Sequence, residues 1–142
     1  MARLQRASSN IERRTQFLPK LSREDFLRLS ATADVLLDTI HFCGGNTSYE
    51  AFAMGTPVVT MPGELLRGRL THAMYQQLEL PELSVNSPAA YVELAVKLGM
   101  NRDYRQHIRG EIAQRSGVLF EDHAMLREYE NFFRQAVNSR RN

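Results

Sequence analysis

The sequence predicts an α/β fold in which helices flank a parallel sheet. Two observations predict it. Short, continuously apolar runs alternate with segments whose apolar residues recur at helical spacing, and a glycine-rich turn joins one such run to the next helix. Strands that alternate with helices pair in parallel through right-handed crossovers, and their ligand site lies at the carboxyl ends of the strands. We therefore expect a functional site at that edge of the sheet.

Four segments are predicted as strands. Residues 15–18 form a short strand that Pro19 ends. Residues 35–37 and 58–61 form two further strands, and residues 83–85 form a weak one. The run at 35–37 is of the apolar kind that is buried on both faces. In the usual doubly wound strand order the first strand here would be the third and the second the fourth, so residues 35–37 lack a partner on one side. We expect self-association through that exposed sheet edge.

Helices are predicted from capping residues and from spacing. Ser22 caps the first helix, with Asp25 three residues later as a variant of the capping box, and Asn46 caps the second. Ser87 precedes Pro88 as N-cap and first helical residue of a later helix, and another helix follows a cap at position 101. The predicted ranges are 22–33, 47–54, 64–78, 87–98, a helix after 101, and 122–137.

Two of these helices carry apolar stripes that we expect to be core. Helical spacing of apolar residues is typical of a face packed against the rest of a domain. The stripes are Tyr91, Leu94, Ala95 and Leu98 in one helix, and Met125, Tyr129, Phe132, Phe133 and Ala136 in the last.

Composition is that of an ordinary globular protein and excludes several functional classes. The chain has 142 residues, of which 43% are hydrophobic and 24% charged, with a net charge of +2. That length fits a single domain, residues 1–142, with a helical C-terminal part at about 87–138. Basic residues are dispersed, no apolar run approaches the roughly 18 residues of a membrane helix, and Cys43 is the lone cysteine. We predict a cytoplasmic protein without nucleic-acid or membrane partners.

The block GGNTSYEAFAMGTPVVTMPG, residues 44–63, carries the predicted chemistry. Gly44 and Gly45 lie at a loop-to-helix junction, where backbone N–H groups and the helix dipole attract an anion. The hydroxyl of Thr47 follows, and Glu50 lies one turn later with its side chain leaning back toward the helix N-terminus. A phosphate cradle beside a carboxylate suits a nucleotide, with the diphosphate on the amides and the ribose hydroxyls on Glu50.

For the residues around this block, a role in ligand binding and a purely structural role are both possible interpretations. A tight turn alone also explains the glycine pair. His41, at the cleft edge, contacts phosphate or sugar, or is a loop histidine without a function. Arg67 and Arg69 stand in the first turns of a helix, where cations oppose the dipole, and they face an anion or serve packing and surface roles. No base adjoins Cys43 to activate it, so a filler role is favoured, and the histidine spacing predicts no metal site.

The same block resembles the sugar-nucleotide signature of GT-B glycosyltransferases. With LPKLSREDFLRLSATADVLLDT before it, ELLRGRL after it and SPAAYVELAVKLGMNRDYRQHIR further on, the chain is similar to the C-terminal, donor-binding lobe of the protein O-GlcNAc transferase and SPINDLY-like family, glycosyltransferase family 41. The resemblance covers most of the chain. It implies a Rossmann-like parallel sheet with flanking helices, as a partial C-terminal lobe.

The resemblance also implies roles for individual residues. Gly45, Asn46 and Thr47 occupy the positions that hold the donor diphosphate, and Glu50 the position that holds the ribose. Arg23 falls on the ribose side, Phe26 where a ring stacks on uracil, and Leu21 where the backbone meets the base edge. Animal members have histidine in place of Gly45 and threonine in place of Asn46, so the phosphate contact here rests more on backbone groups.

What the resemblance implies about function is donor binding for glycosyl transfer. A UDP-sugar of the UDP-GlcNAc type would send its sugar to a protein hydroxyl, with inversion and without a metal or other cofactor. The family's repeats and N-terminal catalytic lobe, which supply the acceptor groove, are not expected in this chain, so we expect a fragment that is inactive by itself. The alternatives are UDP-glucose transfer to protein and a non-catalytic nucleotide-sugar-binding or interaction module left by truncation.

Overall fold

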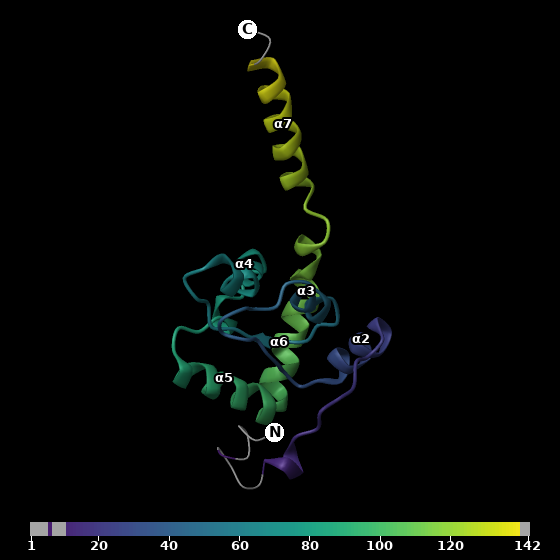
Figure 1. The fold of residues 1–142 in the computed structure, drawn as a ribbon, viewed down its shortest axis with the longest axis vertical. Helices are drawn as coiled ribbons and strands as arrows, with labels where there is room; N and C mark the ends of the chain where they lie inside the picture. The colour runs from purple at the N-terminus through teal and green to yellow at the C-terminus, as the bar shows by residue number, and fades with distance from the viewer. Residues whose placement is uncertain (1–5, 7–10, 140–142) are drawn as a thin grey trace.

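The computed structural model describes residue 6 and residues 11–139, and it is mostly helical around a small parallel sheet (Figure 1). The N-terminal 3-10 turn and the last helix lie at opposite ends of the molecule. In chain order the elements are the 3-10 turn η1 (Glu12–Arg14), α2 (Arg23–Thr32), β1 (Leu36–Leu37), α3 (Asn46–Ala53), β2 (Val58–Val59), η2 (Leu66–Gly68), α4 (Leu70–Gln77), η3 (Pro81–Leu83), α5 (Pro88–Met100), α6 (Arg102–Arg115), η4 (Ser116–Leu119) and α7 (His123–Ser139).

The sheet consists of β1 and β2, paired in parallel as predicted. Leu36 lies opposite Val58, and Leu37 opposite Val59. The predicted weak strand at residues 83–85 is reduced to one parallel bridge, between Thr60 and Ser84. On its other side, within the described residues, β1 has no neighbouring strand. The outer edge of β1 is therefore open, as the sequence predicted.

A buried tyrosine closes the other side of β2 at Val58. The Tyr75 hydroxyl donates to the Val58 carbonyl and accepts from the Val58 N–H, both at 2.8 Å. Its ring is fully buried and packs against Phe52 with centroids 4.8 Å apart. Burial raises the pKa of the Tyr75 hydroxyl far above its ordinary value. One phenol thus takes the place of a backbone partner for β2.

Three arginines of α6 join this helix to the carboxyl ends of four others. Arg105 bonds the last turn of α5, Arg109 the ends of α2 and α3, and Arg115 the residues after α4, in positions where cations complement the helix dipole. The carbonyl acceptors, at 2.6–3.3 Å, are those of Leu98 and Gly99 for the first arginine, Ala31, Ala33 and Met54 for the second, and Leu78 and Glu79 for the third.

The apolar core lies between α3, α4, α5, α6 and β2. The α5 stripe behaves as predicted, since Leu94 and Leu98 are buried and Tyr91 and Ala95 pack against them. The caps predicted for α2, α5 and α6 are confirmed, because Ser22, Ser87 and Asn101 each accept a first-turn N–H. The buried apolar residues are Ala51, Phe52, Val58, Val59, Met74, Tyr75, Leu78, Leu80, Leu83, Leu94, Leu98, Ile108 and Ile112.

Four structural predictions are wrong. Residues 15–18 form no strand and are largely exposed, because no strand of the described residues lies beside them to complete their hydrogen bonds. Leu37 is 58% exposed instead of buried on both faces, because the described residues do not cover the face of the sheet on which its side chain lies. The helix predicted from residue 64 begins only at Leu70, after η2, in which the buried Gly68 accepts from the Gly63 N–H. The α7 stripe is exposed rather than core.

Candidate functional site

The glycine pair forms the loop between β1 and α3. The Gly44 N–H donates to the Asp38 carboxylate at 2.6 Å. A Cβ at Gly44 would collide with Ser48 Oγ and lie 2.8 Å from Thr47 Oγ1, so any larger residue here would force these hydroxyls to move. A Cβ at Gly45 would make an ordinary van der Waals contact, with Leu70 Cδ1 at 3.7 Å. The two glycines therefore differ: a side chain at Gly44 would displace the hydroxyls of Thr47 and Ser48, whereas a Cβ at Gly45 would only touch Leu70.

Helix α3 begins one residue earlier than predicted. Its N-cap is Gly45, without a side-chain cap, and Asn46 is the first helical residue rather than the cap. The Gly45 carbonyl accepts the N–H groups of Ser48 and Tyr49 at 3.0 and 3.2 Å. In the described part of the chain, the N–H groups of Asn46 and Thr47 have no hydrogen-bond acceptor, and both residues are exposed. Two unpaired donors at a helix N-terminus form a place for an anion.

One hollow of about 440 Å³ between α2 and α3 gathers five predicted site residues. Phe26 and Arg23 come from α2, Thr47 and Glu50 from α3, and Leu21 from the segment before α2. Phe26 and Leu21 are half-buried, so an aromatic ring and an aliphatic side chain line it. We name it the α2–α3 hollow; it is completed by Leu18, Pro19, Ser22 and Leu29.

Two of the residues that line this hollow form an ion pair. Arg23 Nε lies 3.3 Å from Glu50 Oε1, and the arginine side chain is 82% exposed whereas the carboxylate is 21% exposed. An exposed pair of this kind contributes little to stability. The arrangement places a largely buried carboxylate beside an exposed cation, a suitable pair for a polyhydroxylated ligand.

A second hollow, of about 600 Å³, is also lined by Arg23 and Glu50. Asn46 belongs to its wall. Phe120 contributes from beyond η4, and its ring meets that of Tyr49 edge-on with centroids 6.0 Å apart. Sequence reasoning missed Tyr49 and Phe120, which are 71 positions apart in the chain and therefore leave no local signal. The remaining lining residues are Leu27, Ala53 and Met54.

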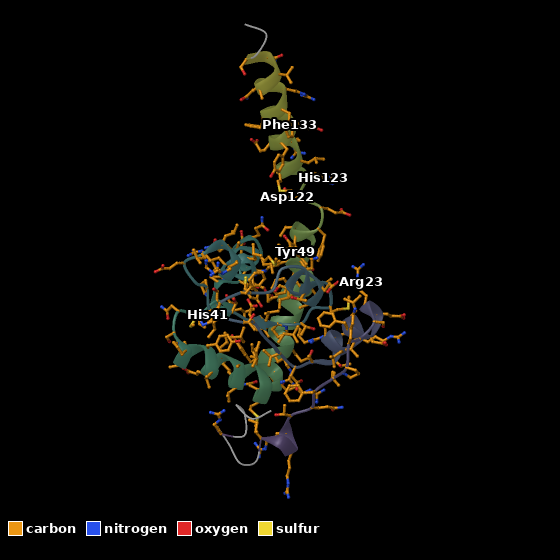
Figure 2. All side chains as sticks on the ribbon, viewed as in Figure 1. Arg23, His41, Tyr49, Asp122, His123 and Phe133 are labelled. Atoms are coloured by element: carbon orange, nitrogen blue, oxygen red, sulfur yellow. The ribbon has the colours of Figure 1, made fainter. Side chains whose placement is uncertain are left out.

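His41 does not join the other predicted site residues. It lies in a separate hollow of about 240 Å³ with Arg67, Gly63 and Gly68, and Figure 2 shows it apart from Arg23. Arg69 donates to the Gly63 carbonyl at 3.2 Å, which favours a packing role for that arginine. Cys43 is buried, and its Sγ accepts the Leu70 N–H at 3.2 Å, as a filler would.

Sequence reasoning also missed the anchoring role of Asp38. Its carboxylate accepts from the Gly44 N–H and from the Thr60 hydroxyl, at 2.6 and 2.8 Å. The Tyr91 hydroxyl donates to its backbone carbonyl at 2.7 Å, and burial together with the Asp38 charge raises the pKa of Tyr91. The available signal was position, because a carboxylate that directly follows a predicted parallel strand stands at the carboxyl edge of the sheet.

Two negative findings apply to the described residues alone. Among residues 6 and 11–139, no three His, Cys, Asp or Glu side chains are grouped so that they could hold a metal ion. The same residues contain no helix that is long and apolar enough to cross a membrane.

Known proteins resemble this chain along most of its length. A sequence model of the family described as Glycosyl transferase family 41 matches residues 2–129. A Caenorhabditis elegans UDP-N-acetylglucosamine–peptide N-acetylglucosaminyltransferase is 33% identical over 116 residues, 80% of this chain and 10% of that protein. The SPINDLY protein of Oryza sativa subsp. japonica, named as a probable enzyme of the same kind, is 28% identical over 106 residues, 71% of this chain and 11% of that protein.

A solved structure gives the same result for the fold. A mutant O-GlcNAc transferase of Thermobaculum terrenum superimposes with a TM-score of 0.80 at 30% identity, over 94% of this chain and 27% of that one. The likeness confirms the predicted fold class, a partial GT-B lobe. The chain spans about a tenth of the length of the two curated relatives and about a quarter of the solved one.

Proposed function

The chain belongs to glycosyl transferase family 41, and we propose that its part in that family is to bind the nucleotide-sugar donor, a UDP-sugar of the UDP-GlcNAc type. The observation that carries the proposal is the gathering of Leu21, Arg23, Phe26, Thr47 and Glu50 around one hollow beside the N-terminus of α3. These residues come from two segments that are more than twenty positions apart. An apolar hollow with a few convergent polar groups is typical of a small-molecule site.

The hollow accounts for the nucleoside half of the donor. The half-buried Phe26 ring offers a stacking surface for the uracil, a contact worth about 1–3 kcal/mol per base. Glu50 accepts hydrogen bonds from the ribose hydroxyls, and its partial burial keeps the carboxylate in position. Arg23, largely exposed, pairs with Glu50 in the absence of a ligand and turns toward the donor when the ribose takes its place.

The start of α3 accounts for the diphosphate half. The N–H groups of Asn46 and Thr47 have no acceptor among the described residues, and the positive end of the helix dipole adds to their attraction for phosphate. The Thr47 hydroxyl lies at the same place and also lines the hollow. In the complete family protein these donors would stabilise the departing UDP during inverting, metal-independent transfer to a protein hydroxyl.

Titration of the chain with nucleotides tests the proposal. UDP, UDP-GlcNAc and UDP-glucose should bind, and the order of their affinities identifies the donor. EDTA and added Mg²⁺ should leave the UDP affinity unchanged, because no carboxylate group of the described residues is arranged for a metal.

A matched pair of phenylalanine variants locates the site. Phe26→Ala should weaken UDP binding roughly fivefold or more through loss of base stacking. Phe42→Ala removes the same ring from an exposed position, 68% accessible, outside the hollow, and should leave the affinity unchanged. Equal loss in both variants, or UDP binding that needs a divalent metal, would contradict the proposed site.

A further inference from the structure

Asp38 has every polar atom engaged at the carboxyl edge of the sheet. Its two carboxylate oxygens accept from the Gly44 N–H and the Thr60 hydroxyl, its carbonyl accepts from Tyr91, and its own N–H donates to Val59 at 3.0 Å. It is 9% exposed. Burying a carboxylate to this degree costs free energy unless the carboxylate is fully hydrogen-bonded. The hydrogen bonds to Asp38 offset that cost.

The hydrogen bond that the Gly44 N–H donates to Asp38 fixes Gly44, which lies two residues before the first residue of α3. Its length of 2.6 Å is that of a strong, charge-assisted hydrogen bond. From the opposite side the Thr71 hydroxyl of α4 donates to the Gly44 carbonyl at 3.3 Å. Both polar groups of the Gly44 backbone are thus held, one from the end of β1 and one from α4.

We propose that Asp38 is a positioning residue for the diphosphate site, holding Gly44 so that the N–H groups of Asn46 and Thr47 stay directed toward the donor. This inference rests on the function proposed above. Asp38 itself does not touch the donor, because its oxygens are occupied by protein groups and its charge would repel phosphate. Its effect is carried by the backbone of the loop.

Two substitutions separate the hydrogen bond from the charge. Asp38→Asn and Asp38→Ala both remove the negative charge beside the phosphate site. The asparagine can still accept from the Gly44 N–H through its carbonyl, while the Thr60 hydroxyl rotates to accept from its amide. The alanine leaves Gly44 without that acceptor. A difference between these variants therefore reports the bond to Gly44 rather than electrostatic repulsion.

The experiment is an NMR titration of the whole chain and its variants with uridine and with UDP. Uridine fills the α2–α3 hollow alone, whereas UDP also reaches the start of α3. We expect Asp38→Ala to bind UDP roughly tenfold more weakly than Asp38→Asn, with equal uridine affinities, as for loss of one or two hydrogen bonds. The Gly44 amide proton should exchange faster with solvent in the alanine variant only.

The outcomes distinguish this inference from the function on which it rests. If the wild-type chain binds uridine and UDP and both Asp38 variants bind UDP equally, the positioning role is wrong and the donor site stands. If wild type binds no UDP, both are overturned. Parallel losses for uridine and UDP would show that Asp38 supports only the general fold, which also contradicts the role.

Two further variants guard against unfolding. Thr60→Val keeps the size of the side chain and frees one carboxylate oxygen, and it should weaken UDP binding about threefold without affecting uridine. Tyr75→Phe removes hydrogen bonds to Val58, away from the loop, and should lower the unfolding temperature while both affinities stay unchanged. An unchanged UDP affinity in Thr60→Val, together with a lower one in Tyr75→Phe, would overturn the inference.

Discussion

Helices α5 and α7 carry similar apolar stripes, but the stripe of α5 is buried in the core and the stripe of α7 is exposed to solvent. In α5, Leu98 is fully buried and Leu94 is 8% exposed. In α7, every residue is exposed, including Phe132 at 63% and Phe133 at 61%, and the helix projects from the rest of the molecule (Figure 1). Periodicity thus predicts that a segment is helical and which face is apolar, but a partner for that face has to come from elsewhere in the structure.

The largest expected difference between the two helices is in core truncation. Leu98→Ala should lower the free energy of unfolding by about 2–5 kcal/mol, because it leaves a cavity in the core. Phe132→Ala should change it by no more than about 0.5 kcal/mol, since the ring is already in water. Urea denaturation measures both. A cost above about 1.5 kcal/mol for Phe132→Ala would show that the α7 stripe is covered in solution.

The second largest difference is expected between an arginine of α6 and an arginine of α7, in the stability lost when each is replaced. Arg109→Leu removes a guanidinium that bonds the ends of α2 and α3, and it should cost about 3 kcal/mol, the upper range for hydrogen bonds to a charged group. Arg134→Leu in α7 removes only an exposed ion pair to Glu130 at 3.9 Å, with an effect within about 0.5 kcal/mol. Thermal unfolding at matched salt would test this; similar losses for the two variants would refute the division.

Ligand binding should also be confined to the body of the molecule. Glu50→Ala should weaken UDP binding by about 1.5–3 kcal/mol through loss of charged hydrogen bonds to the ribose. Glu128→Ala, on α7, removes an equivalent carboxylate and should not change the affinity. Calorimetric titration measures both variants, and an unaltered UDP affinity in Glu50→Ala would exclude that residue from the site.

The smallest expected effect concerns alkaline pH. Because burial raises the pKa of Tyr75, the folded state holds this proton more tightly than the unfolded state. The contribution of this proton to the free energy of unfolding is fully present below a pH of about 10. Above that pH the free energy of unfolding decreases by up to about 1.4 kcal/mol per pH unit. Tyr75→Phe should remove that part of the slope in urea denaturation between about pH 9 and 11. An identical slope in the variant would contradict the burial of the hydroxyl.

The features that sequence predicted are those set by near neighbours. Ser22, Ser87 and Asn101 each accept from an N–H three residues away, so the start of each helix is encoded locally. Gly44 likewise meets groups three and four residues ahead. The family resemblance added the gathering of Phe26 and Glu50, which no local pattern contains.

The features that sequence missed depend on distant contacts. Arg109 reaches Ala31 across 78 positions, and the Tyr91 hydroxyl reaches Asp38 across 53. Residues 15–18 have the composition of a strand, but a strand forms only beside another, and their sequence does not say whether one is present. The roles of individual donor-site residues stay predictions.

The hydroxyl of Tyr75 has a consequence for assembly. It blocks the outer edge of β2 at Val58, and the bridge to Ser84 occupies the same edge at Thr60, so among the described residues only β1 offers an edge for a further strand. A sheet with one usable side cannot propagate. Two copies that meet through their β1 edges about a twofold axis would each use up their single open flank, and the assembly would close as a pair instead of lengthening into a fibre.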